Sequence, residues 1–234
     1  MNVRYKLTLW VGVAFVLFLS ACVKSDPDDC VSVPKGIDVY FYSLSPCQTD
    51  TVYPVDITDL MVGVFDQEGI LVTHSKQANV ELEKEFFRQL EVSSGLYTVV
   101  ACSGLGDDSF QVEEWKDGVT TKKDVLFRIK RAGGYAYSLR NKKVFYGESP
   151  AVYVAEDQDP DAPFEKATIN MQEITNRLSV TVEGLDLSLF DILIESNNGT
   201  MNFDGTVAPD EVLAYEPAYV PSTFGFTAFL RCSN

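Results

Sequence analysis

The chain has 234 residues, 46% of them hydrophobic, and its 34 Asp and Glu against 19 Lys and Arg give a formal net charge of −15 at pH 7. This excess of negative charge repels phosphate backbones, and no basic stretch is dense enough to reverse it, which argues against a nucleic acid partner. The hydrophobic content lets one large or two small domains bury a core and argues against a disordered chain.

The first 21 residues predict an export signal that ends at a lipid-attachment cysteine. Two basic residues precede an apolar run, residues 7–19, which is too short to cross a bilayer and suits the h-region of a signal peptide. The following tetrapeptide, Leu19-Ser20-Ala21-Cys22, resembles the lipobox of bacterial lipoproteins. That resemblance implies a diacylglycerol on the Cys22 sulfur, cleavage before Cys22, and an acyl chain such as palmitate on the new amine. An ordinary export signal with a chance cysteine is the alternative.

Residues 22–36 read as an acidic tether between the lipid and the first folded segment. Asp26, Asp28 and Asp29 stand close behind Cys22. This arrangement resembles the surface-export signal of Bacteroidota lipoproteins, which implies display on the outer face of the outer membrane. A solvated linker without an export role is the alternative.

Four further cysteines lie in a chain predicted to leave the reducing cytoplasm, where disulfides form. We expect Cys30 and Cys47 to pair, because this bond would tie the start of the fold to the turn after the first strand. Four cysteines allow three complete pairings, so the connectivity stays open. A zinc site is not expected, since there is no CxxC spacing and His74 is the only histidine.

Short β-branched and aromatic runs, separated by Gly, Asp, Asn and Pro, predict an all-β fold. We expect an N-terminal β-sandwich over residues 37–155, with a hairpin turn at Asp66-Gln67-Glu68-Gly69. Residues 81–91 carry charges at helical spacing, but the Ser-Ser-Gly that follows favours an extended passage. The other runs predict strands at Ile37–Tyr42, Leu60–Phe65, Ile70–Val72, Leu96–Cys102, Val125–Lys130, Val144–Tyr146 and Val152–Ala155.

Residues 156–165 are acidic and proline-bearing, which predicts a linker between two domains. A C-terminal β-sandwich is expected over residues 166–234. This second domain is short, because a seven-stranded sandwich takes about 100 residues. Its strands are expected at Ala167–Ile174, Arg177–Val182, Phe190–Glu195 and Phe224–Leu230.

The sequence gives no sign of catalysis or of a cofactor. Nucleophilic catalysis of the Ser-His or Cys-His kind needs an imidazole, and His74 reads as a lone surface residue on a strand. The glycines near Cys102 lack the spacing of a phosphate-binding loop. Asp157, Asp159 and Asp161 alternate as in a calcium loop, but the glycine and the bidentate glutamate of such a loop are missing. We therefore expect neither an enzyme nor a metal site.

Several segments stand in a fixed order behind the lipobox: Asp28-Asp29-Cys30, Ile37–Tyr42, Leu60–Gly69, Gly95–Val100, Val144–Gly147 and Thr175–Leu185. In this combination, which covers most of the chain, the sequence resembles the FimB-like fimbrium anchoring-subunit family, lipoproteins of the Bacteroidota fimbrillin superfamily. Each segment alone is only a strand-and-turn pattern. Their order and their place behind Cys22 make the combination specific.

The resemblance implies two transthyretin-like β-sandwich domains and a structural role. Such a protein fixes a fimbrium to the outer membrane through lipid on Cys22 and helps to end filament growth, with fimbrillin or another fimbrial subunit as partner. We expect the subunit contact to use β-augmentation. Relatives continue beyond the strand that matches Phe224 to Arg231, so truncation is one explanation of the short second domain, and it would leave an open edge or groove.

A surface-displayed binding module for glycan or host protein is the alternative function. Its aromatic platforms would be Trp115, Tyr135 and Tyr137. Core packing or cross-strand pairing is the other use of these side chains.

Overall fold

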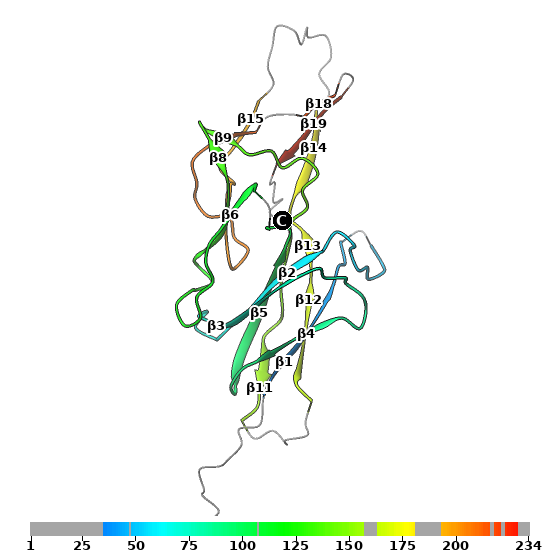
Figure 1. The fold of residues 1–234 in the computed structure, drawn as a ribbon, viewed down its shortest axis with the longest axis vertical. Helices are drawn as coiled ribbons and strands as arrows, with labels where there is room; N and C mark the ends of the chain where they lie inside the picture. Colours follow the sequence, from blue (N-terminus) through cyan, green and yellow to red (C-terminus); the bar gives the residue numbers. More distant parts are fainter. Residues whose placement is uncertain are drawn as a thin grey trace, which may run out of the picture. The chain divides into compact units, whose positions relative to one another are not determined.

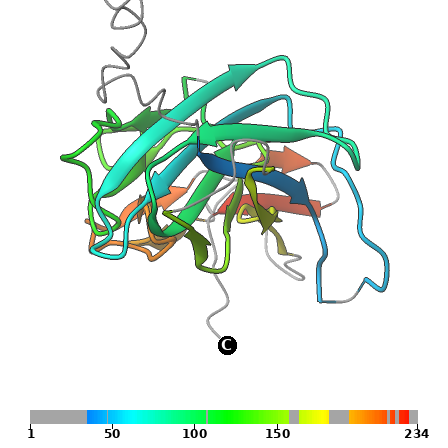
Figure 2. The ribbon, with the colours of Figure 1, turned by 90° about the horizontal axis from the view of Figure 1, so that it is seen from below.

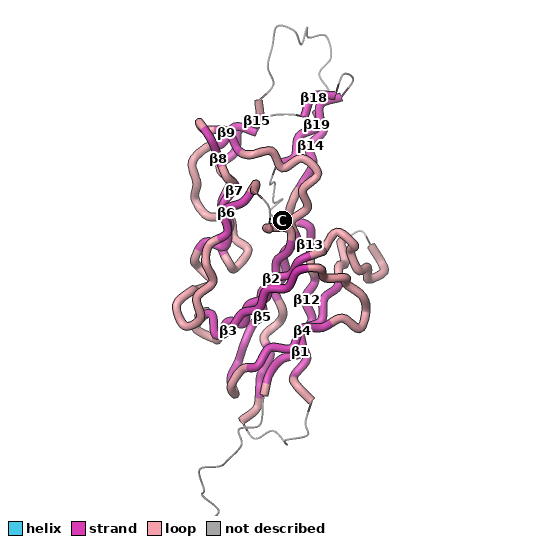
Figure 3. The backbone as a smooth tube through the Cα atoms, viewed as in Figure 1, coloured by secondary structure: helices cyan, strands magenta, loops and turns pink. Residues whose placement is uncertain are grey.

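The structure, a computed structural model, describes residues 35–46, 48–106, 108–156, 163–180, 193–215, 218–220 and 223–228. These residues form strands, turns and loops and no helix, as the colours of Figure 3 show. No helix within these ranges is long and apolar enough to cross a membrane. The predicted all-β fold class is confirmed.

Nineteen strands are assigned in the described residues, and Figure 1 labels most of them along the ribbon. They are β1 (Gly36–Tyr42), β2 (Asp59–Phe65), β3 (Leu71–Ala78), β4 (Phe87–Glu91), β5 (Gly95–Ser103), β6 (Phe110–Val112), β7 (Val125–Ile129), β8 (Arg131–Ala132), β9 (Tyr135–Ala136), β10 (Phe145–Glu148), β11 (Val152–Val154), β12 (Glu165–Asn170), β13 (Gln172–Glu173), β14 (Asn176–Val180), β15 (Ile194–Ser196), β16 (Thr200–Asn202), β17 (Leu213–Tyr215), β18 (Ala218–Val220) and β19 (Thr223–Ala228).

The largest sheet has the order β13-β10-β5-β2-β3, with β11 also paired to β5, and we call it the central sheet. A three-stranded sheet of order β12-β1-β4 is called the outer sheet. Three smaller sheets have the orders β16-β7-β6, β15-β17-β9-β8 and β14-β19-β18. Except for β1 with β12 and β9 with β17, all paired strands are antiparallel.

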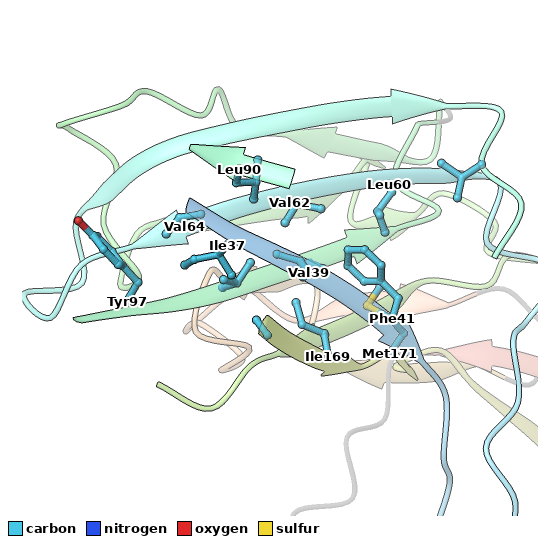
Figure 4. Packing of buried hydrophobic residues seen from close by; sticks show 14 of the residues in the cluster. Ile37, Val39, Phe41, Leu60, Val62, Val64, Leu90, Tyr97, Ile169 and Met171 are labelled. Atoms are coloured by element: carbon cyan, nitrogen blue, oxygen red, sulfur yellow. The ribbon is translucent and has the colours of Figure 1, made fainter. Parts of the chain in front are cut away.

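The first core lies between the outer sheet and one face of the central sheet. In β1, every second residue is apolar and buried, namely Ile37, Val39 and Phe41. Since alternate side chains of a strand point to opposite faces, this pattern sets which face of β1 meets the core. Figure 4 shows these side chains turned toward those of β2, together with Ile169 from β12.

The second core uses the opposite face of the same central sheet. Val99 and Ala101 of β5 belong to the first core, whereas the alternate residues Val100 and Cys102 pack in the second. Strand β2 divides in the same way, with Val64 in the first core and its neighbour Phe65 in the second. The side chains that close the second core come from β6, β7, β16, β17 and the loops around them, among them Phe110, Phe127, Phe203 and Tyr215.

The predicted hairpin between β2 and β3 is confirmed. Gly69 N donates to Asp66 O at 3.0 Å, and Ile70 N donates to the Asp66 side chain at 2.8 Å. Gly69 has φ = 78°, a left-handed conformation that glycine adopts without strain. The turn residues therefore account for the sharp reversal of the chain.

Residues 156–165, expected as a linker between two domains, do not separate the two cores. Strand β12 begins at Glu165 and pairs with β1 in parallel over six residue pairs, so the chain returns to the first core. Residues 201–215 then join residues 65–144 in the second core. In Figure 2 the blue β1 accordingly lies among green and yellow strands that follow much later in the sequence. The described strands interleave, and the described residues from Lys35 onward belong to one compact unit.

Most expected strands occur in the structure with small changes of bounds. Only the last part of residues 81–91 is a strand, β4, and the rest is turn and loop. Three of the expected strands, at 177–182, 190–195 and 224–230, run partly into residues outside the described ranges. The short strands β6, β8, β9, β16, β17 and β18 were not expected, because two or three residues carry too little periodicity to be recognised.

Candidate functional site

The residues predicted to carry the anchor and the tentative disulfide lie outside the described part of the chain. These are Cys22, Cys30 and Cys47, so lipid attachment and the disulfide remain predictions. Asp157, Asp159 and Asp161 also lie outside it. Within the described ranges, no group of three or more His, Cys, Asp or Glu side chains is arranged to hold a metal ion.

Cys102 is a free cysteine on β5 and is 1% exposed in the second core. Burial raises the pKa of the Cys102 thiol above its usual value, and the nearby Asp59 carboxylate adds to the shift. The side chain therefore stays a neutral thiol and serves as a small apolar group in the core.

The three aromatic residues considered as platforms divide into two groups. Trp115 is 4% exposed and packs edge-on against Phe203, with ring centroids 4.9 Å apart. It is a core residue. Tyr135 lies in β9 and Tyr137 follows directly after it, and their side chains are 44% and 46% exposed. Only these two remain available to a ligand.

His74 is not the lone surface residue that the sequence suggested. Its Nδ1 lies 2.7 Å from Asp117 Oδ1, and its ring centroid is 5.9 Å from that of Trp115. The imidazole side chain is 28% exposed. The pair holds the loop that carries Trp115 against β3, which is a structural role.

An ion-pair cluster fixes β8 to the loop before β17. Arg131 donates from both terminal nitrogens to the two oxygens of Asp210, at 2.8 and 2.9 Å, and also to Glu211 at 2.8 Å. Thr200 donates to Asp210 at 2.6 Å. Burial alone would raise the pKa of Asp210, but the hydrogen bonds from Arg131 and Thr200 outweigh it and lower that pKa. The Asp210 side chain is only 9% exposed, so the cluster is part of the fold.

A surface depression of about 380 Å³ lies beside the β2–β3 turn. The turn residues 66–69, the loop residues 121–123, the first half of β5 and Ala151 line it. Leu96 in this lining is 43% exposed, and Tyr153, its partner across the pairing of β5 with β11, is 64% exposed. Lys122, which also lines the depression, forms an ion pair with Glu148 at 2.5 Å.

This surface could not be predicted from the sequence, because it depends on which residues of β11 pair with which residues of β5. Leu96 and Tyr153 are 57 residues apart, and they meet only because β11 pairs with the start of β5. The available signal was the alternation in β11, where Val154 is buried and Tyr153 is exposed.

Two solved structures share this fold. The fimbrial anchor protein Mfa2 from Porphyromonas gingivalis superposes with a TM-score of 0.79 at 32% identity, over 86% of this chain and 75% of that chain. A DUF1812 protein from Bacteroides thetaiotaomicron superposes with a TM-score of 0.68 at 20% identity, over 83% of this chain and 71% of that chain. The second likeness concerns the fold alone.

The sequence itself is similar to a curated relative, the minor fimbrium anchoring subunit Mfa2 of Porphyromonas gingivalis. The two are 34% identical over 212 residues, which is 89% of this chain and 63% of the relative, so this chain spans less than two thirds of that protein. Residues 28–230 match the family described as fimbrillin-A associated anchor proteins Mfa1 and Mfa2. The match runs from before β1 to beyond β19 and includes both cores, and the chain belongs to this family.

Proposed function

We propose that this chain is a structural lipoprotein at the base of a fimbrium, which it fixes to the outer membrane and whose growth it helps to end. The family match over residues 28–230 carries the proposal. The relative at 34% identity is named a fimbrium anchoring subunit, and the function is taken from that name. The partner is a fimbrillin or another fimbrial subunit.

The attachment to the membrane is assigned to Cys22. A filament held together by non-covalent contacts drifts away unless its base is fixed to the cell. Each buried methylene of a lipid chain contributes about 0.8 kcal/mol, and stable anchoring takes more than one chain. A diacylglycerol together with an N-acyl chain at Cys22 meets this requirement. The acidic tether of residues 22–36 supports display on the cell surface.

The test is the fraction of filaments that stays on cells when Cys22 is replaced. In cells that express Cys22→Ala, we expect most filaments in the medium, whereas wild-type cells retain them. Ser25→Ala changes the adjoining tether without removing the sulfur and is expected to retain filaments. Incorporation of a labelled palmitate into wild type but not into Cys22→Ala checks the chemistry directly. Equal retention by wild type and Cys22→Ala would mean that the chain does not anchor the filament.

The alternative function, a surface module that captures glycan or host protein, draws support from Tyr135 and Tyr137. Both are nearly half exposed and lie two residues apart, so both rings are accessible for stacking on a ligand. Isolation of the chain from membranes separates the two functions, because an anchoring subunit brings fimbrial protein with it and a glycan-binding module does not.

A further inference from the structure

The start of strand β5 has one open edge. Val99 N donates to Ser149 Oγ at 2.9 Å, and Val99 O accepts from Ser149 N at 2.8 Å, so the peptide groups of Val99 face the side of β10 and β11. Backbone groups of successive residues in a strand point to opposite edges. Thr98 and Leu96 therefore direct theirs to the other edge, where Thr98 pairs with Phe65 of β2.

Strand β2 does not reach as far as Leu96. It ends at Phe65, and the chain turns away at residues 66–69. Within the described ranges, no strand pairs with Leu96 on this edge. The N–H and the C=O of Leu96 therefore have no partner among the described strands at this edge of the sheet. A longer β2 would have paired with them.

The surroundings of this edge favour a polypeptide as its occupant. A donor and an acceptor on one residue of a strand are matched by the backbone of an extended segment. The depression of about 380 Å³ borders the edge, and Leu96 and Tyr153 offer apolar surface on the same face. The Thr98 Oγ1 atom in its lining is buried and has no hydrogen-bond partner within the described part of the chain.

We propose that the open edge of β5 at Leu96 receives an extended segment of a neighbouring fimbrial subunit, which pairs with β5 and places an apolar side chain against Leu96 and Tyr153. The inference rests on the proposed function, because that function supplies the partner. What the inference adds is the place of contact on this chain. The two backbone hydrogen bonds set the register of the segment, and the apolar pair sets which residue it presents.

The test uses full-length protein extracted from membranes and fimbriae sheared from cells that lack this chain. We expect the double variant Leu96→Asp and Tyr153→Asp to bind fimbriae at least about tenfold more weakly than wild type, because the new carboxylates would be desolvated in the contact. The matched control is Val55→Asp with Val212→Asp. These side chains are 89% and 62% exposed, and they lie in loops and not in β5 or β11. The control is expected to bind like wild type.

Hydrogen exchange gives a second measurement that does not depend on a substitution. The Leu96 amide is expected to exchange fast in the free protein and at least about tenfold more slowly with fimbriae bound. If wild type binds fimbriae but the double variant binds equally well and Leu96 stays unprotected, the edge is not the contact and the anchoring function still stands. If wild type binds no fimbriae, both proposals fail.

Discussion

The two cores of this molecule lie on opposite faces of one sheet and differ in what fills them. The first core is mostly aliphatic, with Val and Leu from β2 against Ile and Val from β1 and β12. The second is rich in aromatic rings, such as Phe65, Trp115 and Phe203, and an ion-pair cluster at Arg131 borders it. Both cores share β2 and β5, and the second draws more of its side chains from short strands and loops.

Because β2 and β5 contribute to both cores, we expect the two to unfold together. Trp115 is the only tryptophan after residue 21, so its fluorescence reports on the second core. Circular dichroism reports on the strands of both. Substitutions in the second core therefore test whether the two cores unfold as one unit or separately.

The largest expected effect is that of Phe203→Ala. The Phe203 ring is fully buried and lies 4.9 Å from the Trp115 ring and 5.7 Å from the Phe65 ring, measured between centroids. Its loss should lower the free energy of unfolding by about 3–5 kcal/mol. Urea unfolding followed by fluorescence and by circular dichroism should give one shared midpoint. Two separate transitions would show that the first core is stable without the second.

Next in size is Arg131→Met. This change leaves the Asp210 carboxylate, 9% exposed, without its bidentate partner. The free energy of unfolding should fall by about 2–3 kcal/mol. This is less than for a fully buried pair, because the Arg131 side chain is 22% exposed. Lys123→Met is the matched control. Its ion pair with Asp204 involves a lysine side chain that is 82% exposed, and it should cost less than about 1 kcal/mol. Equal effects of the two changes would contradict a structural role for the cluster.

Gly63→Ala tests the coupling of the two cores through β2. A Cβ at this position in β2 would lie 2.7 Å from the Trp115 ring and 2.9 Å from Leu71, both in the second core. Overpacking of this kind costs about 1–3 kcal/mol. Gly106→Ala is the control, since a Cβ there meets nothing within 4 Å. The Trp115 emission should change for Gly63→Ala and not for Gly106→Ala.

The smallest expected effect is a dependence of stability on pH through Asp210. Its pKa is lowered in the folded state, so its contribution is complete above the ordinary carboxylate pKa of about 4 and is lost as pH falls through the lowered value. For wild type we expect this contribution to be constant between pH 7 and 5 and to fall below about pH 4. Asp210→Asn should be less stable at pH 7 and should show a weaker decline in acid. An equally steep acid decline in that variant would assign it to other carboxylates.

The strands of the first core could be predicted from the sequence better than those of the second, for a physical reason. β1 and β2 are seven residues long each; buried and partly buried residues alternate in β1, and β2 is a mostly apolar run that is buried at its end, so both are long enough to be recognised. The second core depends on strands of two or three residues and on Trp115 in a loop, which have no period. The parallel return of β12 beside β1 was also missed, because an acidic segment with prolines reads in the same way whether the chain leaves a domain or comes back to it.

The position of β1 has a mechanical consequence. It is the first described strand after Cys22, and it lies in the middle of the outer sheet with β12 on one side and β4 on the other. Under the proposed function, a pull on the filament would reach the described strands first at β1, and a force directed along this strand would load its two neighbours together. Six residue pairs to β12 and five to β4 would then share the load in shear instead of opening one after another. A terminal strand held on both sides is therefore suited to resist forced unfolding, which depends on the rate of unfolding and not on equilibrium stability.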